Sequence, residues 1–276
     1  MRAGASGLAV AVAAFALGFG ASAAWMWLSP LGPSEPSPSP TSAAASALQA
    51  PAPIVTPSPV LPLATPPATA AAAGFSKHAF LLDTPASPWV VVNKRRPLEP
   101  QDYVPPELVE LAELPGGGGQ YLIPEAAEAL RALHAAADAE GAGFRVSTAY
   151  RSYERQREIF ADYVRRLGTA KAELAAARPG YSEHQTGRAV DIYTTAECRL
   201  KQCFADTPAG RFVAAHAHEH GFIVRYPEGK TDVTGYEYEP WHLRYVGVEL
   251  ATEMHVTGPY TMEEFFDLPP APDYLD

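Results

Sequence analysis

Charge is almost absent from the first 73 residues of this 276-residue chain. They contain one basic residue, Arg2, and one acidic residue, Glu35, so the whole net charge of −10 falls on residues 74–276. The remainder is long enough for one domain with a sizeable core. Its acidic balance argues against nucleic acid as a partner, because a phosphate backbone is bound by clustered lysine and arginine.

The segment from Leu8 to Leu28 has no charged residue at all. As a helix it would span about 30 Å, the thickness of the hydrocarbon core of a bilayer. Two interpretations remain open. The small residues Ala21 and Ala23 are typical of a signal-peptide cleavage site, whereas the apolar run continues through Trp25 and favours an uncleaved membrane anchor. Both predict that residues 1–28 direct export, so that the protein is extracytoplasmic and either membrane-anchored or secreted.

Residues 29–73 lack the apolar pattern of a folded segment and alternate proline with serine, alanine and threonine. Such a sequence buries too little apolar area to offset its ordering entropy and favours extended polyproline conformations. At about 3.1 Å per residue it would reach on the order of 140 Å. We therefore expect a disordered spacer over residues 29–73, followed by one folded domain over residues 74–276.

Cysteine is scarce, since Cys198 and Cys203 are the only two in the sequence. In an exported chain, two cysteines this close in sequence more often form a local disulfide than supply two ligands of a metal site. No further soft ligands with suitable spacing accompany them. We predict a disulfide between Cys198 and Cys203.

Residues 74–276 mix helical and strand patterns without the regular alternation of a parallel α/β fold, which indicates the α+β class. Apolar spacing and turn residues predict helices over residues 124–141, 152–166, 170–177, 207–220 and 261–266, and strands over residues 90–92, 144–147, 189–193, 222–226 and 242–246.

Three short segments carry residues suited to hydrolytic chemistry. His184 and Asp191 are close enough in sequence to meet one metal ion, and Glu239 precedes His242 by three residues. Two imidazoles and one carboxylate would leave a fourth position open, as in catalytic rather than structural zinc sites. Arg151 places a permanent positive charge between a predicted strand and a predicted helix, where a substrate would be handled.

Singly, each of these residues has an ordinary structural explanation, but in order and spacing they resemble the D-alanyl-D-alanine carboxypeptidases of the VanY type. These are zinc peptidases related to D-Ala-D-Ala dipeptidases and to Hedgehog signalling domains. The resemblance implies an α+β fold with a small antiparallel sheet flanked by helices. It covers about residues 88–265 and is carried by Ala149-Tyr150-Arg151-Ser152-Tyr153, Ser182-Glu183-His184-Gln185-Thr186-Gly187 and Tyr238-Glu239-Pro240-Trp241-His242.

The resemblance assigns a role to each of the five candidate residues. It implies that His184, Asp191 and His242 bind one Zn²⁺. Glu239 would be the general base that takes a proton from the attacking water and passes a proton to the leaving amine. Arg151 would donate to the developing oxyanion.

The resemblance also implies that Gln156 and Ser182 contact the substrate. The expected activity is removal of the terminal D-alanine from peptidoglycan stem peptides, by a monomer. The sequence leaves open an L,D-carboxypeptidase, a D,D-dipeptidase or a cross-link endopeptidase with the same site, because pocket shape depends on loops 194–206 and 226–236. A zinc-containing binding module without catalysis is a further alternative, although binding alone would require neither Glu239 nor Arg151.

A rival metal site is suggested by His216 and His220, which are four residues apart in a predicted helix. The residue directly after His216 is not a glutamate, so the pattern of the thermolysin-type zinc peptidases is missing. Histidine is also favoured near the carboxyl end of a helix by the helix dipole. We therefore do not expect a metal there.

Overall fold

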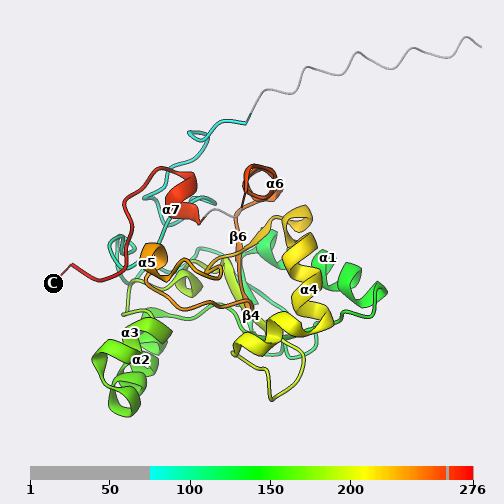
Figure 1. Ribbon diagram of the computed structural model, residues 1–276, viewed down its shortest axis with the longest axis horizontal. Coiled ribbons are helices and arrows are strands. Elements are labelled where there is room, and N and C mark those ends of the chain that lie inside the picture. Colours follow the sequence, from blue (N-terminus) through cyan, green and yellow to red (C-terminus); the bar gives the residue numbers. More distant parts are fainter. Residues whose placement is uncertain (1–74, 259–260, 276) are drawn as a thin grey trace, which may run out of the picture. The chain divides into compact units, whose positions relative to one another are not determined.

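The computed structural model describes residues 75–258 and 261–275 (Figure 1). The predicted membrane segment over residues 1–28 and the spacer over residues 29–73 lie outside the described residues and stay predictions. Within the described part of the chain, no helix combines the length and apolar character needed to cross a bilayer.

A four-stranded antiparallel sheet lies at the centre of the described domain, with the strand order β3-β4-β6-β5. This confirms the expected small antiparallel sheet. A separate two-stranded sheet, which the sequence pattern did not predict, precedes it in the chain. The strands are β1 (Val109–Glu110), β2 (Tyr121–Leu122), β3 (Arg145–Thr148), β4 (Ala189–Tyr193), β5 (Phe222–Val224) and β6 (His242–Tyr245).

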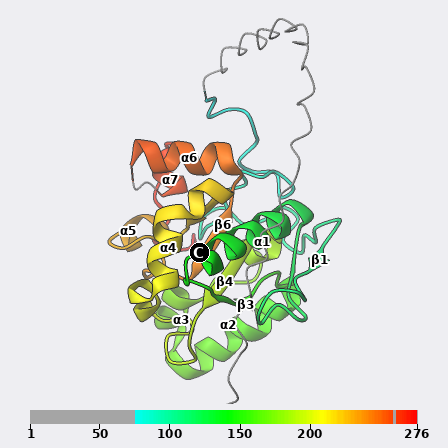
Figure 2. The ribbon, with the colours of Figure 1, turned by 90° about the vertical axis from the view of Figure 1, so that its right-hand side faces the viewer.

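Helices surround the central sheet. Helices α1 and α4 pack against each other, while α6 and α7 lie at one end of the domain and α2 and α3 at the other (Figures 1 and 2). The α-helices are α1 (Pro124–Ala139), α2 (Tyr153–Leu167), α3 (Thr169–Ala175), α4 (Pro208–His216), α5 (Thr231–Thr234), α6 (Val248–Thr257) and α7 (Met262–Phe265). Short 3-10 helices are η1 (Glu183–Thr186), η2 (Gln202–Asp206) and η3 (Ala217–His220).

Helix α1 supplies one side of the main core, as its sequence predicts. Pro124 stands in its first turn, where a missing backbone N–H costs nothing. The alanine-rich face that includes Leu130 and Leu133 is fully buried against Val190 of β4 and Leu243 of β6. The two central strands, which carry predicted site residues, are therefore held against a rigid helix.

The predicted strand over residues 90–92 does not form. Val90 and Val92 are buried in one cluster and Val91 in another, so the side chains alternate as in a strand. Their carbonyl groups are bonded by arginine side chains instead of a neighbouring strand: Arg244 Nη2 donates to Val90 O at 2.9 Å, and Arg96 Nε donates to Val91 O at 3.2 Å. With these acceptors satisfied by side chains, the segment runs as extended chain without a ladder.

A buried network of charges joins the central sheet to the carboxyl-terminal helix. Arg225, just after β5, donates to both oxygens of Glu263 in α7, at 2.7 and 2.9 Å. Arg225 Nε and Arg244 Nη1 both donate to Glu183 Oε1, at 2.9 and 2.8 Å. All four side chains are fully buried. Burial alone would raise the pKa of Glu183 and Glu263, but the adjacent arginines outweigh it and lower both pKa values.

We expect Glu263→Gln to lower the free energy of unfolding by about 3 kcal/mol, because it leaves a buried guanidinium short of one charged partner. Urea unfolding measures this loss. Glu249→Gln, on the exposed side of α6, is the control and should change stability by less than about 0.5 kcal/mol. The pKa of Glu263 is lowered from 4.5, so its contribution is complete above that pH and is lost as the pH falls below it. Equal losses in both variants would contradict this role of the network.

Candidate active site

Strand register brings two of the predicted metal ligands together. Asp191 of β4 and His242 of β6 are directly opposite each other in the antiparallel ladder, so their side chains share one face of the sheet. His184 reaches the same place from η1. One ligand atom from each of the three residues lies within 4.8 Å of the other two. All three side chains are buried.

Each of the two imidazoles lies close to a different oxygen of the Asp191 carboxylate. His184 Nε2 lies 3.3 Å from Asp191 Oδ2, and His242 Nδ1 lies 3.0 Å from Asp191 Oδ1. Ligand atoms around a tetrahedral zinc ion are about 3.3 Å apart, given metal–ligand distances of about 2.0 Å.

The polar group on the far side of each imidazole favours one ring nitrogen as the atom that faces the cluster. His184 Nδ1 donates to Ala149 O at 2.8 Å, which leaves the Nε2 lone pair for a metal. His242 is oriented the other way: its Nε2 lies 3.6 Å from Glu183 Oε2, and in the described part of the chain neither atom has a hydrogen-bond partner. A proton on Nε2 facing this carboxylate leaves Nδ1 free as a ligand. The cluster therefore fits one zinc ion.

The two imidazoles of the cluster have pKa values that are shifted in opposite directions. Burial lowers the pKa of His184, and the nearby Arg151 lowers it further. Burial also opposes the charged form of His242, but its hydrogen bond to Asp191 and the nearby Glu183 carboxylate outweigh this and raise its pKa to about 9. A metal ion entering the cluster would therefore displace a proton from His242.

The predicted base lies beside the metal ligands. Glu239 donates its backbone N–H to Tyr226 O at 3.0 Å and accepts from the backbone N–H of His242 at 3.1 Å. This turn brings Glu239 Oε2 to 3.8 Å from His242 Nδ1, with 15% of the side chain exposed. Burial, reinforced by the Asp191 charge, raises the pKa of Glu239 to about 8. A carboxyl group with this pKa exchanges protons near neutral pH.

The predicted oxyanion donor is held next to the same cluster. The backbone N–H of Arg151 donates to His184 O at 3.2 Å. Burial lowers the pKa of Arg151, whereas the carboxylates of Asp191 and Glu239 favour its charged form. Its Nε is buried and, among the described residues, has no hydrogen-bond partner. A substrate oxygen could therefore satisfy a donor that the protein leaves unpaired.

These residues line one cleft. Its polar part includes the three metal-binding candidates with Glu239, Arg151, Ser182 and Glu183, and its apolar part includes Ile159, Tyr163, Leu174, Leu200, Tyr236 and Trp241. Ser182 thus lies where a substrate contact was predicted. Gln156 does not line the cleft: its Nε2 donates to Ala177 O at 2.6 Å and supports a wall residue. Its direct contact with substrate stays a prediction.

Sequence reasoning missed Glu183 as a functional residue. Glu183 stands inside a recognised motif, but its partners Arg225 and Arg244 are 42 and 61 residues away. The arginines occupy Glu183 Oε1 and leave Oε2 to face the imidazole of His242. Only the adjacency of a carboxylate to a histidine ligand hinted at this role, and adjacency alone is not specific.

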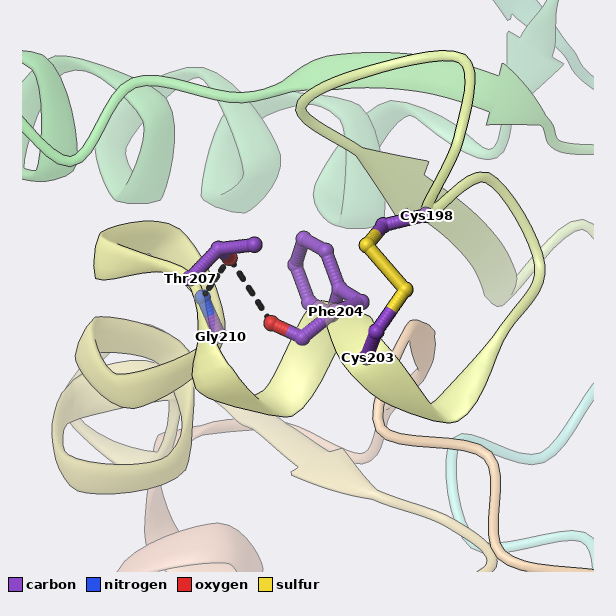
Figure 3. Close-up of a disulfide and its surroundings, with 5 residues drawn as sticks. All are labelled: Cys198, Cys203, Phe204, Thr207 and Gly210. Atoms are coloured by element: carbon purple, nitrogen blue, oxygen red, sulfur yellow. Dashed lines mark hydrogen bonds between the residues drawn. A yellow bond between two sulfur atoms is a disulfide. The ribbon is translucent and has the colours of Figure 1, made fainter.

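The structure also describes the two cysteines and the rival pair of histidines. Cys198 and Cys203 form a disulfide (Figure 3). His216 pairs with Glu219 at 2.9 Å, and α4 ends at His216. Within residues 75–258 and 261–275, His184, Asp191 and His242 form the metal-binding group that the geometry identifies. His216 and His220 are not part of it.

Comparison with known proteins identifies the family. Residues 119–248 match the family model VanY, described as D-alanyl-D-alanine carboxypeptidase. The bifunctional D-Ala-D-Ala dipeptidase and D-Ala-D-Ala carboxypeptidase VanXYC of Enterococcus gallinarum is 34% identical over 180 residues, which cover 64% of this chain and 92% of that protein. The chain belongs to the VanY family. It is accordingly a peptidase of the zinc carboxypeptidase type, and the resemblance inferred from its motifs is confirmed.

Solved structures of VanY-family peptidases share its fold. The LD-carboxypeptidase LdcB is 40% identical with a TM-score of 0.59, and the match covers 66% of this chain and 87% of that chain. The vancomycin-resistance D,D-pentapeptidase VanY from a VanB-type cassette, solved with Zn(II), is 34% identical with a TM-score of 0.55. That match covers 64% of this chain and 97% of the other.

We expect Glu183→Gln to weaken zinc binding about 10- to 100-fold, because His242 loses the charge that fixes its tautomer and orientation. Competition with a chromophoric chelator measures the affinity. Glu263→Gln is the matched control, since it weakens the same arginine network without touching His242. If both variants bind zinc equally well, Glu183 has no role beyond stability.

Proposed function

We propose that this chain is an extracytoplasmic, zinc-dependent D-alanyl-D-alanine carboxypeptidase that hydrolyses the terminal D-alanine from peptidoglycan stem peptides. In this proposal residues 1–28 are a signal peptide or signal-anchor, residues 29–73 are a spacer, and residues 74–276 are the catalytic domain. The nearly uncharged start of the chain supports the extracytoplasmic location.

The observation that carries the proposal is the convergence of five side chains on one cleft. A His/Asp/His set with zinc-like spacing, a carboxyl group with a pKa near 8 and an unpaired arginine donor all line it. A binding module would need neither of the last two. Their combination supports hydrolysis of a peptide bond.

In the proposed mechanism His184, Asp191 and His242 hold the metal. A zinc ion bound there would supply Lewis acidity and would make the attacking water easier to deprotonate. Glu239 accepts a proton from the attacking water and returns a proton to the leaving amine of D-alanine. Arg151 stabilises the negative charge that develops on the carbonyl oxygen, a role worth about 3 kcal/mol in comparable sites.

The second candidate activity is that of an L,D-carboxypeptidase. The similarity to the LD-carboxypeptidase LdcB, at 40% identity, favours it. The metal ligands and the base would act in the same way on either bond, because both reactions hydrolyse an amide next to a terminal D-alanine. The two activities differ in the residue that precedes the scissile bond.

We expect the protein to release D-alanine from a peptide ending in D-Ala-D-Ala, and a chelator to abolish the release until zinc is restored. Glu239→Gln should lower kcat by about 10²- to 10⁴-fold while zinc content stays at one ion per chain, because the variant loses only the proton acceptor. Glu228→Gln, an exposed neighbour outside the cleft, is the control and should keep its activity. Zinc-bound protein without turnover would favour the binding module instead.

Product analysis on stem peptides of different length separates the two activities. We expect kcat/KM for removal of D-alanine to be higher with a pentapeptide ending in D-Ala-D-Ala than with the tetrapeptide ending in a single D-alanine. Liquid chromatography with mass detection follows both reactions under the same conditions. A preference for the tetrapeptide would contradict the D,D assignment and support the L,D-carboxypeptidase.

A further inference from the structure

A loop that is closed by a disulfide contributes Leu200 to the cleft. The loop follows β4, the strand that carries Asp191, and the bond between Cys198 and Cys203 encloses Arg199, Leu200, Lys201 and Gln202. Leu200 lines the cleft together with the metal-binding candidates. It is 40% exposed, so the body of the protein does not bury it.

The ring is anchored at its start to the strand beside β4. Arg199 Nε donates to Ser147 Oγ at 2.9 Å, and Arg199 Nη2 donates to Ser147 O at 3.3 Å. The guanidinium carbon of Arg199 also lies 5.1 Å from the ring centroid of Tyr193. Ser147 is buried in β3. The residue next to Leu200 is therefore fixed to the central sheet.

The far end of the ring is anchored in the core. Phe204 follows Cys203, is fully buried, and lies beside the disulfide (Figure 3). Its carbonyl oxygen accepts from the Thr207 hydroxyl at 2.7 Å, and Thr207 Oγ1 accepts from Gly210 N at 3.0 Å. A Cβ at Gly210 would lie only 2.0 Å from Phe204 O, so this close approach requires glycine.

Leu200 itself has an uncommon backbone conformation. Its φ is +53°, in the left-handed region that non-glycine residues avoid at a cost of about 1–2 kcal/mol. Leu200 is 40% exposed, so complete burial of its side chain does not offset the cost of this conformation. A backbone conformation of this kind, held by anchors on both sides and located at a cleft, points to a role in binding.

We propose that Leu200 is a substrate-binding residue and that the ring closed by the Cys198–Cys203 disulfide holds it in position. This inference rests on the proposed function. Leu200 would complete the apolar wall formed by Ile159, Tyr163 and Leu174. The ligand that fits is a short peptide whose small apolar side chains, such as the methyl groups of D-alanine, pack against this wall while its polar backbone faces the metal ligands.

Steady-state kinetics on a pentapeptide ending in D-Ala-D-Ala test the role of Leu200. Leu200→Ala should raise KM about tenfold with little change in kcat, because apolar contact binds substrate and transition state alike. Leu200→Met should restore the wild-type KM. Leu167→Ala is the matched control, since Leu167 is 45% exposed, similar to Leu200, but does not line the cleft. Its KM should not change.

Two further variants separate binding from folding. Leu200→Gly removes the side chain and accepts the positive φ, so it should show the same rise in KM without loss of thermal stability. The double variant Cys198→Ser and Cys203→Ser opens the ring and should also raise KM about tenfold at unchanged zinc content, because Leu200 is no longer held in place. An unchanged KM in the double variant would overturn the role of the ring.

The proposal and the function on which it rests fail in different ways. If the wild-type protein loaded with zinc releases no D-alanine from any stem peptide, the proposed function is wrong. If the wild type turns over but Leu200→Ala and Leu200→Gly keep the wild-type KM, only the role of Leu200 is overturned.

Discussion

The position of Glu183 between two arginines is the constraint on which the rest of the site depends. Arg225 and Arg244 both donate to one of its oxygens, and this leaves the other oxygen facing His242. A buried carboxylate is costly unless it is paired, and here the pairing also binds η1 to β6 and, through Arg225 and Glu263, to α7. The charge network that joins these elements therefore also places a carboxylate oxygen 3.6 Å from the candidate metal ligand His242.

The metal-binding candidates and the apolar wall of the cleft come from different parts of the chain. The metal-binding candidates come from two central strands and a short helix that pack against the main core, so their geometry follows from sheet register. The apolar wall of the cleft comes from α2, α3 and the disulfide-closed loop. Chemistry and specificity can consequently vary independently, as is common where loops line a site built on a scaffold.

The sequence predicted secondary structure best for elements that are determined by their own residues rather than by distant contacts. The strand over residues 189–193 and the helix that begins at Pro124 appear as predicted, because each has strong periodicity and clear ends. The ligand set followed from motif spacing. Helix α6 was missed, since it starts after Gly247 without a side-chain cap and carries no strong apolar stripe.

Long-range contacts account for the other differences. The segment around Val91 has the composition of a strand, yet arginine side chains from elsewhere occupy its carbonyl groups. The amide of Gln156, whose contact with substrate stays a prediction, donates to Ala177 O, 21 residues away in the chain. In both cases, the deciding partner is not a neighbour in sequence, and propensity alone does not identify it.

Because Asp191 and His242 are paired across β4 and β6, metal binding also depends on the correct register of these two strands. Side chains alternate between the faces of a sheet, so a slip of one residue between β4 and β6 would turn one ligand away from the other. Such a slip would also turn Val190 of β4 away from the main core. The ion therefore binds only to the correctly registered fold, and the energy of coordination is added to that fold alone.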